Sequence, residues 1–277
     1  MLSEWDWRGD KLAASFLWYH EAADQGNAHA QLNLGVLYEN GSGVESDLEL
    51  AVAWYRKAAD QGNPNAEYNL AVCYENGTGV EINLEKAAVA WYHKAADQEH
   101  TIAQLNLGAC YNDGSGVEKN LEMAVTWYRK AADQGYASAQ LNLGFCYENG
   151  SGVEKNLEQA IAWYLKAAEL RNARAQFNLG VCYANGRGVE KNLELAALWF
   201  QKAAVQGISD AQNNLGWSYV SGQVGRAWDT DQAKILLGCP EREHIQFNLG
   251  YFFFLHGISD TERFSKSRRA HLPVSII

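Results

Sequence analysis

The stretch AQLNLGVLYENGSGVESDLELAVAWYRKAADQG, residues 30–62, recurs in altered copies along the 277-residue chain. Its aromatic residues mark the period most plainly. Tyrosines recur at Tyr38, Tyr74, Tyr111, Tyr147, Tyr183 and Tyr219, and tryptophans at Trp18, Trp54, Trp91, Trp127, Trp163 and Trp199. Each series advances by 36 residues except for a single step of 37, which places one inserted residue in LEKAAVAW, residues 84–91. A fixed period of this length is typical of repeat architectures.

Each copy predicts two helices joined by a glycine-rich turn. Apolar residues fall at helical spacing over residues 30–41 and again over 48–62, where Trp54 and Tyr55 lie on one stripe. Gly62 is expected to end the second helix in the left-handed conformation. Capping residues are expected immediately before the second helices, at Asp47, Asn83, Asn120, Asn156 and Asn192.

A two-helix unit cannot bury its apolar stripe alone, so the copies must stack on one another as an all-α solenoid. The expected organisation is a solenoid over residues 1–256 followed by a flexible basic tail. Its parts are a leading helix at 11–25, regular repeats over 28–207, a degenerate repeat over 208–256 and the tail at 257–277.

The pattern AQxNLGxxYxNGxGVxxxxxxAxxWYxKAAxQG resembles that of the Sel-one-like repeat family, which is related to the tetratricopeptide repeats. The match covers about residues 11–220. The resemblance implies a right-handed α-solenoid whose first helices line a concave groove, and a role as an adaptor or scaffold for other proteins. Glu99 and Arg171 replace the helix-ending glycine, and about three residues are missing around 231–243. Strain, bends or disorder are expected at these places.

The turn sequence GSGVEK, residues 114–119, looks like part of a phosphate-binding loop. Such a loop needs a preceding buried strand and a lysine followed by Ser or Thr. Neither is present, and the five copies all lie between two predicted helices. The glycines are therefore interpreted as turn residues, with the following valine packed into the core.

No pattern points to catalysis, to a metal or to a cofactor. Cysteines at one repeat position, Cys73, Cys110, Cys146 and Cys182, are expected about 8 to 10 Å apart in neighbouring copies, too far for disulfides, and are interpreted as reduced core thiols. The histidines lack ligand spacing. Neither a Ser-x-x-Lys nor a G-x-S-x-G motif occurs.

The charge balance narrows the class of partner. With 33 acidic and 23 basic residues the net charge is -10 and the pI about 5.2, which disfavours nucleic acid and anionic membrane. The chain shows no apolar run long enough to span a bilayer and no signal-peptide pattern at its start, so a cytoplasmic location is expected.

The concave groove would be lined by three sets of residues on the first helices. An asparagine row stands two residues before the Gly of NLG: Asn33, Asn69, Asn106, Asn142, Asn178 and Asn214. The aromatic set comprises Tyr68 and a group late in the chain at Phe145, Phe177, Trp217 and Tyr251. Acidic groups stand at Glu39, Glu75 and Glu148. The asparagines could hydrogen-bond an extended peptide or only fix the stacking of repeats, and the apolar rows could be anchors or an ordinary inner face.

The sequence therefore predicts a non-enzymatic scaffold that binds a protein or peptide along its groove. The partner would carry basic and large apolar residues. Two alternatives stay open, a hydrolase that processes β-lactams, as the resemblance to cysteine-rich relatives suggests, and a purely structural spacer. A nitrocefin assay tests the first alternative.

Overall fold

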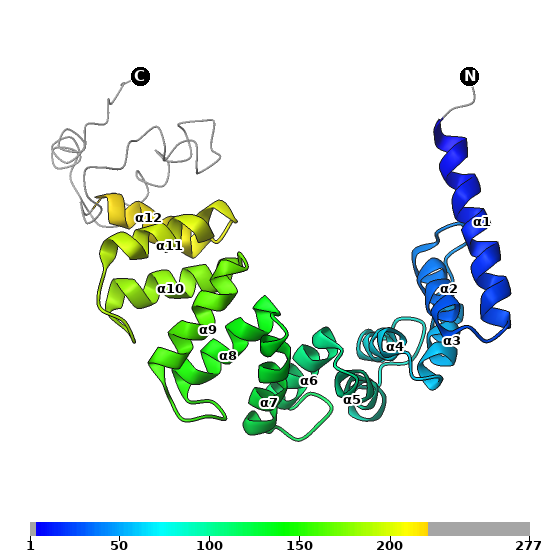
Figure 1. The fold of residues 1–277 in the computed structure, drawn as a ribbon, viewed down its shortest axis with the longest axis horizontal. Coiled ribbons are helices and arrows are strands. Elements are labelled where there is room, and N and C mark those ends of the chain that lie inside the picture. Colours follow the sequence, from blue (N-terminus) through cyan, green and yellow to red (C-terminus); the bar gives the residue numbers. More distant parts are fainter. Residues whose placement is uncertain (1–3, 221–277) are drawn as a thin grey trace. The chain divides into compact units, whose positions relative to one another are not determined.

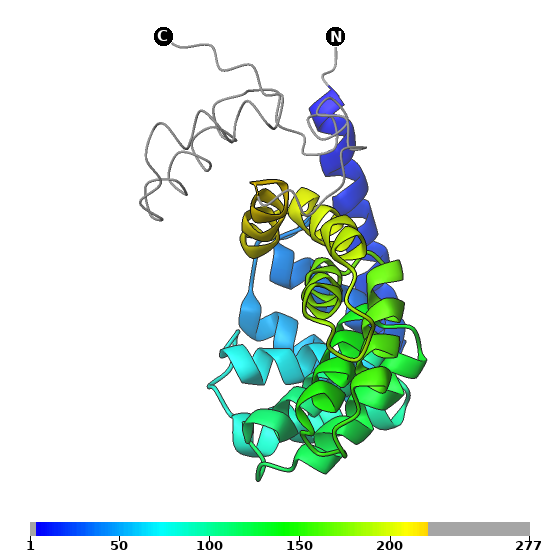
Figure 2. The same cartoon turned by 90° about the vertical axis from the view of Figure 1, so that its left-hand side faces the viewer.

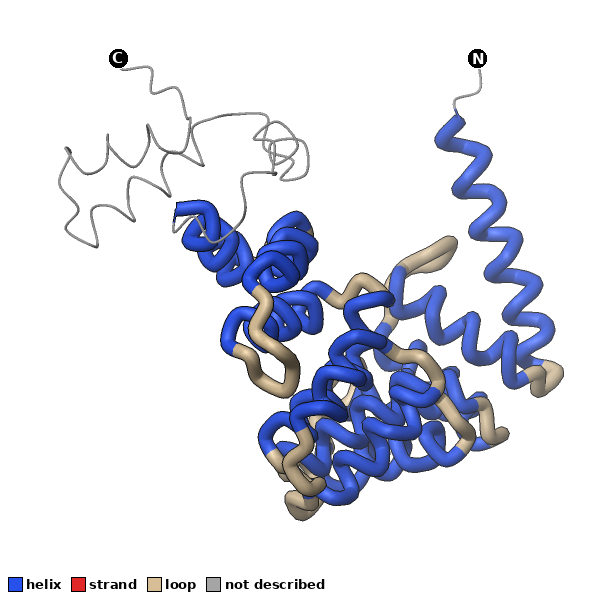
Figure 3. Tube along the Cα trace, turned by 60° about the vertical axis from the view of Figure 1, so that its left-hand side comes forward, coloured by secondary structure: helices blue, strands red, loops and turns tan. Residues whose placement is uncertain are grey.

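The computed structural model of the chain describes residues 4–220, which form helices and connecting turns with no strand (Figure 3). Two compact units divide the chain, residues 1–155 and 156–277. Within each unit, consecutive helices pack against each other, as both cartoon views show (Figure 1 and Figure 2). The predicted all-α fold of paired helices, with a repeat of about 36 residues, is confirmed over this part of the chain.

The first unit holds α1 to α8 and one π-helical turn. Their bounds are α1 Glu4–Asp24, α2 Ala28–Asn40, α3 Leu48–Asp60, α4 Pro64–Asn76, η1 Leu84–Ala88, α5 Val89–Asp97, α6 Thr101–Asp113, α7 Leu121–Asp133 and α8 Ala137–Asn149. The described part of the second unit holds α9 Leu157–Glu169, α10 Ala173–Asn185, α11 Leu193–Val205 and α12 Ser209–Val220. Helix α1 begins at Glu4, earlier than the expected residue 11. The tail and most of the degenerate repeat lie outside the described residues.

Four of the five predicted caps are seen at the start of second helices, and the fifth, Asn83, precedes the π-helical turn η1. The Asp47 side chain accepts a hydrogen bond from the backbone N–H of Leu50 at 2.9 Å. Asn120, Asn156 and Asn192 cap α7, α9 and α11 in the same way. A side-chain oxygen here satisfies an N–H that has no partner within the helix.

The inserted residue is absorbed by the π-helical turn η1 at the start of the second helix of residues 64–100. Ala88 N–H bonds Asn83 C=O at 3.0 Å, a spacing of five residues that holds one residue more than an α-turn. The register of α5 is thereby restored. The junctions that lack glycine are strained as expected, with φ of 64° at Glu99 and 62° at Arg171.

In three of the described repeats the two helices meet where an aromatic ring lies on a glycine, whereas Ala71 holds this position in the repeat of residues 64–100. A Cβ placed on Gly108 of α6 would stand 2.6 Å from the ring of Tyr128 on α7. A Cβ on Gly180 of α10 would stand 2.5 Å from the ring of Phe200 on α11. Because no side chain fits between the helices here, glycine is required and the rings are buried.

A ladder of glutamines joins each repeat to its neighbours. Gln104 of α6 donates to the C=O of Ala96 on α5 at 3.0 Å, and its own carbonyl accepts from Gln134, at the end of α7, at 2.8 Å. The same arrangement recurs at Gln31 and Gln176. The amides satisfy buried carbonyls that close the second helices.

Two variations of the ladder follow from the sequence. Glu67 replaces the glutamine in α4 and accepts from Gln98 at 2.7 Å, while burial raises the pKa of its carboxyl. Leu170 stands thirty residues after Gln140, at the position where Gln134 follows Gln104. Leucine has no side-chain amide, and Gln140 Oε1 has no hydrogen-bond partner among the described residues.

The second helices carry a row of cation–π pairs between a tryptophan and a lysine. In each pair a lysine stands three residues after the tryptophan, with its ammonium 3.7 to 4.1 Å from the ring centroid. The pairs are Lys57 with Trp54, Lys94 with Trp91, Lys130 with Trp127, Lys166 with Trp163 and Lys202 with Trp199.

The glycine-rich turns are structural in the part of the chain described. Gly79 and Gly152 have φ of 66° and 71°, and each lies against the backbone at the start of the preceding second helix. Val80 and Val117 are half-buried and pack against the core. The interpretation of these stretches as turns is confirmed, because both glycines and valine have packing roles.

We predict that Gly108→Ala destabilises the protein by about 2 kcal/mol, since its methyl would overlap the Tyr128 ring. The matched control is Gln159→Ala, at an exposed position of helix α9. That variant should change the free energy of unfolding by no more than about 0.5 kcal/mol. Urea unfolding followed by circular dichroism measures both, and equal effects of the two variants would contradict the packing argument.

A second prediction concerns His100, which caps α6 by accepting the Ala103 N–H on Nδ1 at 3.1 Å. Burial lowers the pKa of His100. A depressed folded pKa means that the cap contributes fully above about pH 6.5 and is lost as pH falls through the folded pKa. Asn27, Asn63 and Asn172 hold the same position and do not titrate.

The substitution His100→Asn should therefore make Tm fall less steeply as the pH is lowered below about 6.5. Thermal unfolding of wild type and variant at several pH values measures it. Burial also lowers the pKa of His93. Because His93 is present in both proteins, the difference between their Tm profiles reports on His100. Parallel Tm profiles for the two proteins would contradict the prediction.

Candidate interaction surface on the first helices

The asparagine row lies on the first helices of the repeats, and its six members are half-buried. They occupy α2, α4, α6, α8, α10 and α12. Asn106 donates to the hydroxyl of Tyr92 at 3.2 Å, and the Asn69 side chain hydrogen-bonds Tyr55. These two asparagines thus hold the preceding second helix. The Asn142 side chain makes no hydrogen bond to any described residue.

Two of the predicted acidic residues, Glu39 and Glu75, are bound to the same tyrosines. Tyr55 donates to Glu39 Oε2 at 2.6 Å, and Tyr92 donates to Glu75. Both rings are fully buried, and burial together with the neighbouring carboxylate raises the pKa of each hydroxyl. Each tyrosine therefore stays a neutral donor that links one first helix to the next.

The second unit lacks this link in one repeat. Ala184 stands where Glu39 and Glu75 stand, and Phe200 stands at the tyrosine position, so the acceptor and the donor are lost together. Sequence reasoning placed the glutamates in the groove and the tyrosines in the core stripe, and it missed their pairing. The joint change to Ala184 and Phe200 is the signal that could have revealed it.

The predicted aromatic residues differ in exposure. Phe145 on α8 and Trp217 on α12 are 56% and 47% exposed. Phe177 is half-buried against Phe200, with ring centroids 5.8 Å apart. Tyr68 is stacked on His100 at 4.8 Å. Tyr251 lies outside the described residues.

Helix α8 brings three of the predicted residues onto one face. Asn142, Phe145 and Glu148 follow at intervals of three, which places them along the same side of the helix. Asn142 and Glu148 are half-buried beside the exposed ring. The combination supplies an amide, an apolar surface and a carboxylate, which suits binding of a polypeptide.

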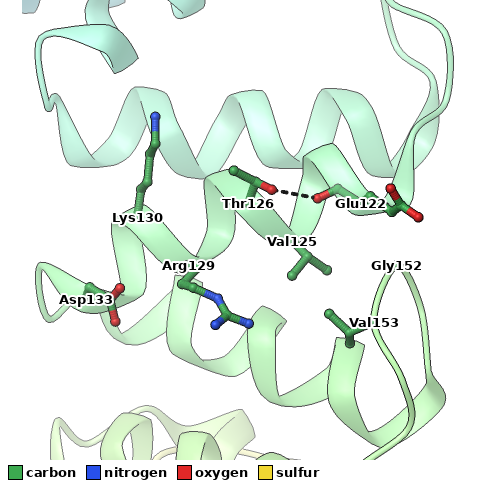
Figure 4. A pocket seen from close by; sticks show the side chains of 8 residues that line it. All are labelled: Glu122, Val125, Thr126, Arg129, Lys130, Asp133, Gly152 and Val153. Atoms are coloured by element: carbon green, nitrogen blue, oxygen red, sulfur yellow. Dashed lines mark hydrogen bonds between the residues drawn. The ribbon is translucent and has the colours of Figure 1, made fainter.

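A separate hollow of about 440 Å³ lies on α7, where sequence reasoning placed no site (Figure 4). Its cations already make other interactions: Arg129 donates to Tyr147, and Lys130 lies over Trp127. Thr126 donates to the C=O of Glu122. Because opposite charges alternate along this face, the hollow offers no focused charge for a ligand. The remaining lining residues are Val125, Asp133, Gly152 and Val153.

The four described cysteines are buried and form no disulfide, as expected for core thiols. Burial raises the pKa of Cys73, Cys110 and Cys146 to about 11, so these thiols are protonated and weakly nucleophilic at neutral pH. Among residues 4–220, no group of three or more His, Cys, Asp or Glu could hold a metal ion.

Comparison with known proteins gives one family. The model described as Sel1 repeat matches residues 11–27, 28–63, 64–100, 101–136, 137–172, 173–208 and 209–238. No curated protein matches the chain. None of the described helices is both long enough and apolar enough to cross a membrane.

Two solved structures are similar over most of the chain. A protective antigen present in uropathogenic Escherichia coli strains, displaying an SLR fold, is 35% identical with a TM-score of 0.78. The match covers 92% of this chain but only 56% of that protein, so the chain spans little more than half its length. A Sel1 repeat protein from Oxalobacter formigenes is 34% identical with a TM-score of 0.68, over 83% of this chain and 96% of that one.

The Glu75–Tyr92 pair gives a prediction of coupling. Tyr92→Phe should cost about 1 to 2 kcal/mol, because it leaves Glu75 and Asn106 without their shared partner. Adding Glu75→Ala reproduces the Ala184 and Phe200 combination, and the double variant should lose about 1 kcal/mol less than the sum of the single changes.

Urea unfolding of the four proteins in the cycle measures this coupling. Glu118→Ala, at an exposed turn position, removes a carboxylate elsewhere and should add to Tyr92→Phe without coupling. Additive behaviour of the Glu75 and Tyr92 changes would show that their hydrogen bond does not stabilise the repeat.

Proposed function

The chain belongs to the Sel1 repeat family, and on that premise we propose that it binds a polypeptide segment carrying basic and large apolar residues along its first helices. Proteins of this family are generally scaffolds for interactions with other proteins. The solenoid fold is typically non-catalytic. The proposal adds to this the face of the repeats, the residues and the chemistry of the partner.

The single observation that carries the proposal is the face of α8. Phe145 is more than half exposed at a repeat position where Val36, Val72 and Val181 stand in other copies. An exposed aromatic ring beside an amide with no partner among the described residues has no evident packing role. Such rings are common anchors at protein interfaces because they bury a large area with few rotatable bonds.

The charge of the first unit supports a basic partner. Residues 4–155 contain 22 acidic and 10 basic side chains, a formal net charge of -12. Residues 156–220 contain 5 acidic and 6 basic side chains, a net charge of +1. The negative charge of the protein is thus concentrated in the unit that carries α8. This field favours the approach of segments with Lys or Arg.

To test the proposal, peptides would be selected from a random library displayed on phage, with the full-length protein as bait. We expect the selected peptides to combine Lys or Arg with large apolar residues. Phe145→Ala should weaken their binding at least about tenfold, as measured by fluorescence anisotropy. Asn142→Ala should weaken binding while Tm stays unchanged, whereas Asn106→Ala should lower Tm because Tyr92 loses a partner.

Leu50→Ala provides the control, because Leu50 is 42% exposed on the second-type helix α3. This variant should bind the same peptides as wild type does. Peptides that bind Phe145→Ala as tightly as wild type would exclude the α8 face. Selected peptides that all lack Lys and Arg would exclude the proposed partner chemistry.

A further inference from the structure

The second unit contains a hollow of about 350 Å³ at the position of the missing Glu–Tyr link. Helices α10, α11 and α12 line it. Its lining residues are Val181, Ala184, Asn185, Lys191, Leu193, Ala196, Phe200, Asn214, Trp217 and Ser218. Ala184, Phe200 and Asn214 hold the repeat positions of Glu39, Tyr55 and Asn69. The hollow therefore occupies the space that a carboxylate and a hydroxyl fill in the first unit.

The floor of the hollow is held in place. The Phe200 ring is buried against Gly180, and Phe177 packs on it at 5.8 Å. Because the ring is fixed on two sides, it cannot move to fill the space left by the shorter Ala184 side chain. The hollow therefore results from Ala184 and Phe200 at the positions of Glu and Tyr, and not from loose packing of a helix.

The chemistry of the lining is that of a receptor for one side chain. The walls are apolar at Val181, Ala184, Phe200 and Trp217. Asn214, at the repeat position that hydrogen-bonds a tyrosine hydroxyl in the first unit, and Lys191 provide polar groups in the lining. Lys191 is exposed and makes no ion pair with a described residue, so it can meet a carboxylate.

We propose that this hollow receives one large apolar side chain of a bound peptide, beside an acidic residue that pairs with Lys191. The proposal rests on the proposed function, because it names a specific contact for a peptide on the first helices. A volume of about 350 Å³ admits a side chain as large as Leu, Phe or Trp. Asn214 can hydrogen-bond the backbone of the same peptide.

The chain itself supplies the variant that closes the hollow. Ala184→Glu combined with Phe200→Tyr restores the pair seen at Glu39 and Tyr55, and should retain or raise Tm because both new polar groups are partnered. The probe is the same random peptide library, selected on the full-length wild type. We expect one class of peptides with a large apolar residue next to Asp or Glu, bound at least about tenfold more weakly by the double variant.

A second variant does not depend on filling the hollow. Lys191→Glu should weaken binding of the same peptides. This variant should bind more tightly to peptides in which the acidic residue is replaced by Lys. Leu198→Ala, on the exposed side of α11, is the matched control and should change neither affinity.

Several outcomes would overturn the proposal. Equal affinity of wild type and the double variant would exclude the hollow as a receptor, while a loss of affinity in Phe145→Ala would still support the proposed function. A marked drop in Tm of the double variant would show that other residues of the chain fill the hollow. Absence of any selected peptide would overturn both this proposal and the proposed function.

Discussion

In three of the described repeats, the contact of an aromatic ring with a bare glycine sets how closely the two helices pack. The ring of Tyr55 lies on Gly35, as Tyr128 does on Gly108 and Phe200 on Gly180, so the two helices approach more closely than any side chain on the glycine would permit. This approach buries the ring and directs its para position between successive first helices. Where that position carries a hydroxyl, Glu39 and Asn69 can both reach it. The ring is thus at once the packing element within a repeat and the link between repeats.

Hydrogen bonds extend this geometry along the chain, through a glutamine ladder in both units and tyrosine links in the first unit. The glutamine ladder joins the ends of the second helices, and the tyrosine links join neighbouring first helices. Both connect nearest neighbours only, as expected for a solenoid, so a change in one repeat alters mainly that repeat and the next. Local independence lets the exposed face vary, and it does so where Phe145 replaces valine and where Ala184 and Phe200 open a hollow.

Much of the fold could be predicted because its signals are local. Helical spacing, the caps at Asp47 and Asn120, and the left-handed glycine at residue 62 each depend on a few neighbouring residues, and the structure confirms them. Even the inserted residue near position 88 was visible as one odd step, although only the structure shows that a π-turn absorbs it. The candidate site was less predictable. Its residues were placed on the first helices, but Glu39 and Glu75 turn out to be bound to buried tyrosines 16 and 17 residues away.

By itself the sequence determined the repeat, its helices, their caps and the face on which the asparagines and aromatic residues stand, because these follow from period and local propensity. Only the tertiary structure decided which of those residues serve packing. Asn106 and Asn142 hold the same position in their repeats, yet Asn106 donates a hydrogen bond to Tyr92 and Asn142 has no hydrogen-bond partner among the described residues. That difference arises because a side chain's availability depends on the groups that neighbouring helices bring to it. The hollow at Ala184 has the same origin, since it exists only where two lost groups from different helices would have met.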